Sequence, residues 1–164
     1  MIATNQIISY PNKFWEIAEH ISKARTLLSE DIYAEGTEKF RGSQEKEISI
    51  NGVMGELIVQ WYCEEKHPNK KIKFASLVDL DPQPEPDMVL DDGVTMDIKT
   101  VPIHKKHCNI NTKAHDNPDK KVDWYWCVNL LSKCTCIFTL YRHRDIYLWE
   151  QKSGYTEYFS KELR

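Results

Sequence analysis

Residues 86–99 constrain the fold more than any other segment, because their pattern predicts a tight β-hairpin. Apolar residues lie on both sides of Asp91-Asp92-Gly93, and a glycine after two aspartates is a common hairpin turn. If these three residues form the loop, with the glycine in the left-handed conformation, Asp87 lies opposite Asp97 and the two side chains share one face. A two-residue turn would instead send the two carboxylates to opposite faces.

The face with the two carboxylates also carries a lysine, because Lys99 follows Asp97 by two positions. Polar residues on one face of a strand often simply face solvent. Here, however, residues 88–90 and 94–96 are nearly all apolar, which indicates strands that are buried on both faces. A carboxylate pair in such surroundings is costly unless a cation lies between the two charges. We therefore expect a Mg²⁺ site at the two aspartates, with the lysine as the catalytic neighbour.

These residues resemble the motif of the PD-(D/E)xK nuclease superfamily, which includes restriction enzymes and Holliday-junction resolvases. The motif consists of Pro86-Asp87 and, after nine intervening residues, Asp97-Ile98-Lys99. Members of the superfamily usually carry an acidic residue on a helix upstream of the hairpin, and Glu56 has that place in this chain. The resemblance covers about residues 48 to 130. It implies an α/β fold with a restriction endonuclease-like core, in which helices flank a mixed central β-sheet.

The resemblance implies a magnesium-dependent endonuclease that hydrolyses phosphodiester bonds, with DNA as the expected substrate. Asp87 and Asp97 would bind the metal together with the backbone carbonyl of Ile98, and Mn²⁺ is expected to substitute for Mg²⁺. The metal would lower the pKa of a bound water. Lys99 would orient or activate that water and stabilise the charge that develops on the phosphate. Glu56 is expected to bind a second metal or to hold a ligand in place.

The helix around Glu56 is predicted to run from Asn51 to about Glu65. Glu56 is the only acid between Asn51 and Cys63, in a segment that is otherwise mostly apolar, which indicates an acid that faces something buried. An ordinary solvated glutamate is the alternative. Gln60 lies one turn later on the same face and is a candidate for contact with substrate or with a metal-bound water.

The stretch after the motif is basic, whereas acidic residues concentrate in residues 79 to 97. Between Pro102 and Lys121 the chain has five lysines and three histidines but only two acids. Such a segment is suited to contact phosphates, and a solvated surface loop is the alternative. The candidate nucleic-acid contacts are Lys105, Lys106, Lys113, His115, Lys120 and Lys121.

The bulk properties fit a single domain of 164 residues. The chain has no apolar run long enough to span a membrane and no signal pattern, so we expect a cytoplasmic protein without a membrane partner. Its five cysteines match neither a disulfide framework nor a standard zinc spacing, so reduced thiols are expected. The net charge of −3 does not exclude a nuclease, because phosphate contacts are local.

Hydrophobic periodicity divides the domain into an N-terminal helical segment of about residues 1–47 and a catalytic core of about residues 48–150. Three- and four-residue spacing predicts a helix over residues 11–31, and the polar residues 32–47 are expected to connect it to the core. Residues 103–121 have weak periodicity, which leaves helix or ordered loop open. Segments rich in β-branched and aromatic residues predict strands, and these are residues 72–78, 86–90, 94–102, 122–131, 136–142 and 145–149.

A single site of this kind cuts one strand at a time, so cleavage of both strands would require a homodimer. The expected partner is double-stranded or branched DNA. Two alternatives have no nuclease activity: a nucleic-acid-binding domain that keeps the nuclease fold, and a protein-interaction module that uses the aromatic C-terminal strands. The intact Asp87, Asp97 and Lys99 argue against a nuclease that has lost its activity.

Overall fold

The computed structural model describes residues 4–28, 45–78, 85–154 and 156–163. Most of the predicted connector at residues 32–47, and most of the proline-containing loop at residues 81–86, lie outside these described residues. The strands are β1 (Ile7–Ser9), β2 (Lys73–Phe74), β3 (Met88–Val89), β4 (Thr95–Val101), β5 (His107–Asn111), β6 (Trp124–Leu130), β7 (Thr135–Arg142), β8 (Glu150–Ser153) and β9 (Glu157–Glu162). The helices are α1 (Phe14–Leu28), α3 (Glu45–Lys66) and α4 (Thr112–Asp116), with short 3-10 helices at Pro118–Lys120 and His143–Leu148.

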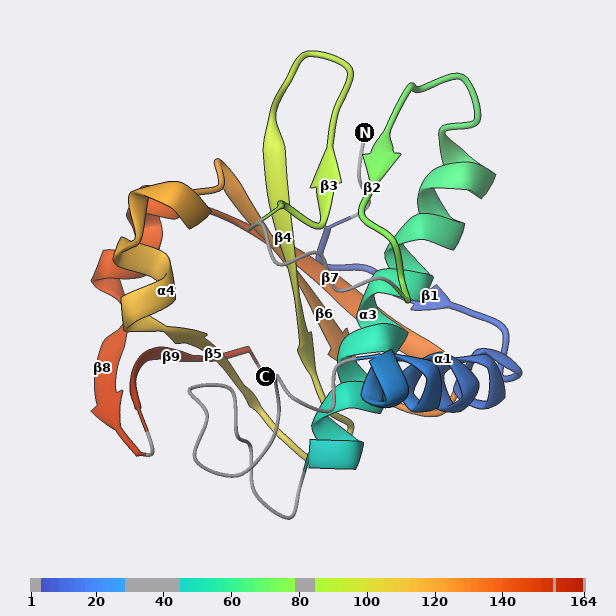
Figure 1. The fold of residues 1–164 in the computed structure, drawn as a ribbon, viewed down its shortest axis with the longest axis horizontal. Coiled ribbons are helices and arrows are strands. Elements are labelled where there is room, and N and C mark those ends of the chain that lie inside the picture. The colour runs from blue at the N-terminus through green and yellow to red at the C-terminus, as the bar shows by residue number, and fades with distance from the viewer. Residues whose placement is uncertain (1–3, 29–44, 79–84, 155, 164) are drawn as a thin grey trace.

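The strands form a six-stranded mixed sheet and a separate three-stranded sheet (Figure 1). The order is β1-β7-β6-β4-β3-β2 in the larger sheet and β5-β9-β8 in the smaller one. β4 and β6 are parallel, and the other pairs of the larger sheet are antiparallel. The chain crosses between these parallel strands through β5 and α4. The architecture is therefore mixed α/β with a curled mixed sheet and helices, as the sequence predicts.

The β3–β4 hairpin has the three-residue loop that the sequence predicts. Met88 pairs with Met96, and one further step along the same register sets Asp87 opposite Asp97. Gly93 has a φ of 86°, which is the left-handed conformation that a three-residue loop requires at this position. The alternative two-residue turn is thereby excluded.

Helix α3 confirms the predicted helix but begins at Glu45, before the expected cap at Asn51. The Asn51 side chain does not cap a helix end. Its amide donates a hydrogen bond to the Glu47 carbonyl one turn earlier, at 2.9 Å, which is a bond within a continuing helix. The stretch before Asn51 is polar because it lies at the partly exposed end of the helix, so its sequence shows little helical periodicity.

Helix α3 lies very close to β4, and a glycine permits this approach. A Cβ atom at Gly55 would overlap the side-chain hydroxyl of Thr100, so any larger residue at this position requires Thr100 or its surroundings to shift. The contact fixes the height of the helix above the strand. It thereby also fixes the position of the next residue, Glu56.

Two hydrophobic clusters lie on the two sides of β4. Met96 and Ile98 belong to the first cluster, in which α1 and α3 cover the larger sheet. Val101 belongs to the second cluster, which lies between the larger and the smaller sheet and includes Cys127 and Phe159. Figure 1 shows α1 and α3 grouped on one side and the smaller sheet with α4 on the other. The prediction that this strand is buried on both faces is confirmed in part: Met96 and Ile98 are buried on one face and Val101 on the other, whereas Asp97 and Lys99 are half-buried.

Three strand predictions need correction. The strand predicted at residues 145–149 is wrong, because His143–Leu148 form a 3-10 helix in which Ile146 alone is buried. The strands predicted at residues 72–78 and 86–90 are each reduced to two residues, in β2 and β3. None of the helices in the described part of the chain combines the length and hydropathy that crossing a bilayer requires.

Candidate active site

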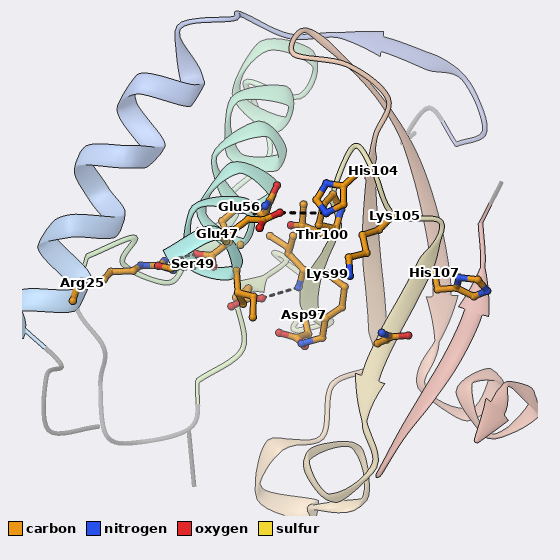
Figure 2. Close-up of a pocket in the computed structure, with 18 residues that line it drawn as sticks. Arg25, Glu47, Ser49, Glu56, Asp97, Lys99, Thr100, His104, Lys105 and His107 are labelled. Atoms are coloured by element: carbon orange, nitrogen blue, oxygen red, sulfur yellow. Dashed lines mark hydrogen bonds and ion pairs between the residues drawn. The ribbon is translucent and has the colours of Figure 1, made fainter. Parts of the chain in front are cut away.

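The four residues predicted as catalytic line one pocket of about 490 Å³. Asp97 and Lys99 come from β4, Asp87 precedes β3, and Glu56 comes from α3. Figure 2 shows this pocket, with Arg25 reaching toward it from α1. Glu56 and Lys99, the two of these four residues that are farthest apart in the sequence, are separated by 43 positions (99 − 56).

Asp97 and Lys99 form a close ion pair, with 2.6 Å between Oδ2 and Nζ. Burial by itself would raise the pKa of Asp97, but the Lys99 ammonium and the hydrogen bonds from Asp87 and Lys99 together outweigh burial and hold that pKa below its usual range. For Lys99, burial would lower the pKa, and the carboxylates of Asp97 and Asp87 raise it instead. At neutral pH, Asp97 is therefore a carboxylate and Lys99 is an ammonium group.

Asp87 lies in a less favourable electrostatic environment than Asp97. Its Oδ2 accepts a hydrogen bond of 2.7 Å from the backbone N–H of Ile98. Even so, burial and the adjacent Asp97 carboxylate raise the pKa of Asp87 well above its usual range. A second negative charge at this point is thus unfavourable unless a further cation balances it.

Glu56 is paired with a residue that the sequence did not indicate. Arg25 on α1 donates to both of its carboxylate oxygens, at 2.8 Å and 3.5 Å, and also donates to the backbone carbonyl of Leu77. Burial raises the pKa of Glu56, and the Arg25 guanidinium opposes this rise. Arg25 and Glu56 are 31 positions apart, so no local pattern could have revealed the pair.

A magnesium ion in this pocket would need ligands besides the protein side chains. Among the described residues, no group of three or more His, Cys, Asp or Glu side chains is arranged to hold a metal ion. Glu56 is engaged with Arg25, which leaves Asp87 and Asp97 as the adjacent carboxyl pair. Mg²⁺ is commonly bound by one or two carboxylates, with water and substrate phosphate in its remaining positions. The raised pKa of Asp87 fits such an ion, because a divalent cation would relieve the repulsion between the two carboxylates.

The structure divides the predicted nucleic-acid contacts into two groups. Lys105 lines the same pocket as the four catalytic candidates, together with His104 and His107. His104 Nε2 lies 3.3 Å from Glu47 Oε1 on the pocket wall (Figure 2). The remaining predicted lysines are exposed and do not line this pocket, and these are Lys106, Lys113, Lys120 and Lys121.

Gln60 and His115 lie elsewhere. Gln60 lines a different pocket and donates to Glu64 Oε1 at 3.3 Å. His115 is only 2% exposed, and its Nδ1 lies 2.7 Å from the hydroxyl oxygen of Tyr125. Ile98, whose carbonyl is expected as a metal ligand, lines the same pocket as the four candidate catalytic residues.

Comparison of the chain with protein-family models, with curated proteins and with solved structures finds no match.

Proposed function

We propose that the chain is a Mg²⁺-dependent nuclease of the PD-(D/E)xK type, built on a restriction endonuclease-like core. The observation that carries this proposal is the hairpin register, which sets Asp87 opposite Asp97 and beside Lys99 in one pocket. Helix α3 with Glu56 before the hairpin, and the buried strand β6 after it, agree with the order of elements that the resemblance implies. Hairpin and helix meet because Gly55 allows a close contact with β4.

In this proposal Asp87 and Asp97 hold the metal, with the Ile98 carbonyl as a third oxygen. When bound, Mg²⁺ supplies a water of lowered pKa and offsets negative charge on the phosphate. Lys99 remains protonated, because the neighbouring carboxylates raise its pKa. We therefore assign it to orientation of the attacking water and stabilisation of the phosphorane charge, and not to proton abstraction. In the reaction, the water oxygen would bond to phosphorus while its proton passes to solvent, one ester P–O bond would break, and the leaving oxygen would take up a proton from solvent.

The pair of Arg25 and Glu56 has a supporting role in this proposal. Arg25 contacts both oxygens of Glu56, so it restrains this carboxylate at the edge of the pocket. A restrained carboxylate can accept hydrogen bonds from metal-bound water without losing its orientation. The substrate proposed is double-stranded or branched DNA, with Lys105 as the nearest candidate for a phosphate contact. Cleavage of both strands would use a homodimer.

The test is cleavage of supercoiled plasmid and of a panel of duplex, branched and single-stranded oligonucleotides, with Mg²⁺, with Mn²⁺ and with EDTA. We expect metal-dependent cleavage by the unaltered chain and a loss of about 10²- to 10³-fold in Lys99→Ala. Lys71→Ala is the matched control, since Lys71 is exposed and outside the pocket. Equal cleavage by the unaltered chain and Lys99→Ala would refute the assignment. Metal-dependent binding without cleavage would favour a nucleic-acid-binding domain that keeps the fold.

A further inference from the structure

Strand β5 presents a polar face to the candidate active site. Its side chains alternate, with His107 and Asn109 exposed and with Cys108 and Ile110 buried in the second cluster. Both exposed residues line the same pocket as the four catalytic candidates. Figure 2 shows His107 on the side of this pocket opposite to Arg25. The smaller sheet therefore supplies part of one wall of the pocket, and the metal site proposed above uses no residue of this wall.

Asn109 is held in one orientation by its neighbour on β9. It pairs with Ser160, so the two side chains share one face of the smaller sheet. Ser160 Oγ donates a hydrogen bond of 2.8 Å to Asn109 Oδ1. Ser160 is only 4% exposed, and among the described residues this amide oxygen is the one acceptor of its hydroxyl. Because a buried hydroxyl needs an acceptor, the oxygen of the Asn109 amide is directed toward β9.

The nitrogen of the same amide is left to donate elsewhere. Nδ2 and Oδ1 diverge from one carbon atom, so the nitrogen lies on the side away from Ser160. In the described part of the chain, β9 alone pairs with β5, so no strand pairs with β5 on that side. Nδ2 carries two N–H groups, and it has no hydrogen-bond partner among the described residues. Asn109 is therefore an oriented donor in the wall of the pocket.

An oriented donor of this kind suits the backbone of a nucleic acid more than its bases. Asparagine recognises adenine through two contacts at once, in which its oxygen accepts and its nitrogen donates. The Asn109 oxygen is turned toward Ser160, so this paired contact is not open to it. Phosphate oxygens accept hydrogen bonds, and such contacts position a nucleic acid without reading its sequence. Lys105, from the loop before β5, lines the same pocket and adds a positive charge that a phosphate requires nearby.

We propose that Asn109 donates a hydrogen bond to a backbone phosphate of the DNA substrate in the candidate active site, and that Ser160 orients the Asn109 amide for this contact. The proposal rests on the nuclease function proposed above and adds a substrate contact to it. Since the contact is to the backbone, it contributes affinity for DNA of any sequence. Asn109 is neutral, so its contact releases no counterion and leaves the salt dependence of binding unchanged.

The first test measures binding and needs no cleavage. The fluorescence anisotropy of a labelled DNA duplex is measured with Mg²⁺ in the Lys99→Ala background, which keeps the duplex intact. We expect Kd to rise about five- to tenfold in Asn109→Ala and by a larger factor in Asn109→Asp, whose charge repels phosphate. A merely structural role predicts the opposite order, because Asn109→Asp keeps an acceptor for Ser160 and Asn109→Ala does not.

Asn69→Asp is the matched control for the added charge, since Asn69 is exposed and outside the pocket. A Kd for Asn109→Asp no larger than that for Asn69→Asp overturns the proposal, provided that thermal unfolding verifies that both variants fold. The role of Ser160 has its own readout. Ser160→Ala should raise Kd about two- to threefold, and adding Ser160→Ala to Asn109→Ala should cause no further loss. A Kd unchanged by Ser160→Ala refutes this role.

The second test separates a backbone contact from recognition of a base. Two duplexes of unrelated sequence should lose affinity for Asn109→Ala by the same factor, and unequal losses overturn the backbone contact. The slope of log Kd against log salt concentration should be unchanged in Asn109→Ala, whereas Lys105→Ala should lower it by about 1. A lowered slope in Asn109→Ala would also overturn the proposal.

Failure of this proposal can be distinguished from failure of the nuclease proposal. If the unaltered chain binds DNA but cuts none, the nuclease proposal fails and the binding results still decide the role of Asn109. If Lys99→Ala abolishes cleavage while Asn109→Asp binds like Asn69→Asp, only the role of Asn109 is refuted. Absence of binding to every duplex refutes both.

Discussion

Replacing Asp87 by asparagine should stabilise the metal-free protein while it removes nuclease activity. The amide oxygen of Asp87→Asn can still accept the hydrogen bond from Ile98, which is 2.7 Å in the present structure. The amide nitrogen can donate to the ionised Asp97 at every pH, whereas the Asp87 carboxyl can do so only while it is protonated and repels Asp97 once it is ionised. A hydrogen bond to a charged group contributes about 1.5–3 kcal/mol. Since 1 kcal/mol shifts the Tm of a domain of this size by about 2–4 °C, the Tm should rise by about 3–12 °C.

The assay is thermal unfolding in EDTA at several pH values, because linkage fixes the sign of the effect. The pKa of Asp87 is raised, so the folded state binds more protons than the unfolded state between the ordinary value, about 3.9, and the raised one. The unaltered protein therefore loses stability as the pH rises through this window, and Asp87→Asn does not. The Tm difference between the two proteins should grow from about pH 4 toward pH 7.

A matched control separates this local effect from general loss of negative charge. Asp91 lies exposed in the hairpin loop, and Asp91→Asn should change stability by less than about 0.5 kcal/mol. Added Mg²⁺ should raise the Tm of the unaltered protein by mass action and should raise that of Asp87→Asn much less. An unchanged or lowered Tm of Asp87→Asn in EDTA would refute the argument that two carboxylates repel each other here.

Three further predictions concern stability. Gly93→Ala should lower the free energy of unfolding by about 1 kcal/mol through its positive φ alone, because no atom lies within 4 Å of the new Cβ. Gly52→Ala within α3, where the new Cβ also meets no atom, should instead raise it by about 0.5–1 kcal/mol. Urea unfolding with unchanged m-values measures both changes, and changes of equal sign would contradict the backbone argument. Arg25→Ala should lower the free energy of unfolding by about 3 kcal/mol, because it leaves the Glu56 carboxylate without its guanidinium partner. Glu56→Gln should lower it less, because the amide oxygen can still accept a hydrogen bond from Arg25. The reverse order of denaturation midpoints would exclude this explanation. Burial lowers the pKa of His115 from 6.5 to about 4, so between these pH values the unfolded chain binds a proton that the folded chain does not. As the pH falls from 6.5 to 4, the protein should therefore lose up to about 3 kcal/mol of stability relative to His115→Phe. Parallel curves of stability against pH for the two proteins would rule this out.

The hairpin could be predicted because its determinants are local. Asp91-Asp92-Gly93 specifies the loop length, loop length specifies the register, and the register aligns the two carboxylates and Lys99. The existence of helix α3 could also be predicted, although its start at Glu45, before Asn51, could not. Predictions thus succeeded where a few consecutive residues contain the whole physical cause.

The features that could not be predicted depend on contacts between distant segments. The pairing of Arg25 with Glu56 exists only because α1 lies beside α3. Strand β5 has only Cys108 and Ile110 on its buried face, and β8 and β9 are mostly polar, so these strands give a weak sequence signal. His115 lies in a segment with five lysines and was interpreted as part of a basic surface, but the crossover between β4 and β6 buries it against Tyr125.

The position of β4 between two clusters also bears on the order of events when the chain folds. Met96 and Ile98 need the helices to cover them, and Val101 needs the smaller sheet, to which β9 contributes Phe159. Val101 on this strand is therefore covered only after β9 has joined the structure. For a chain with the proposed activity, we expect a partly synthesised or partly unfolded molecule without β9 to hold the strand of Asp97 and Lys99 less firmly than the complete domain does.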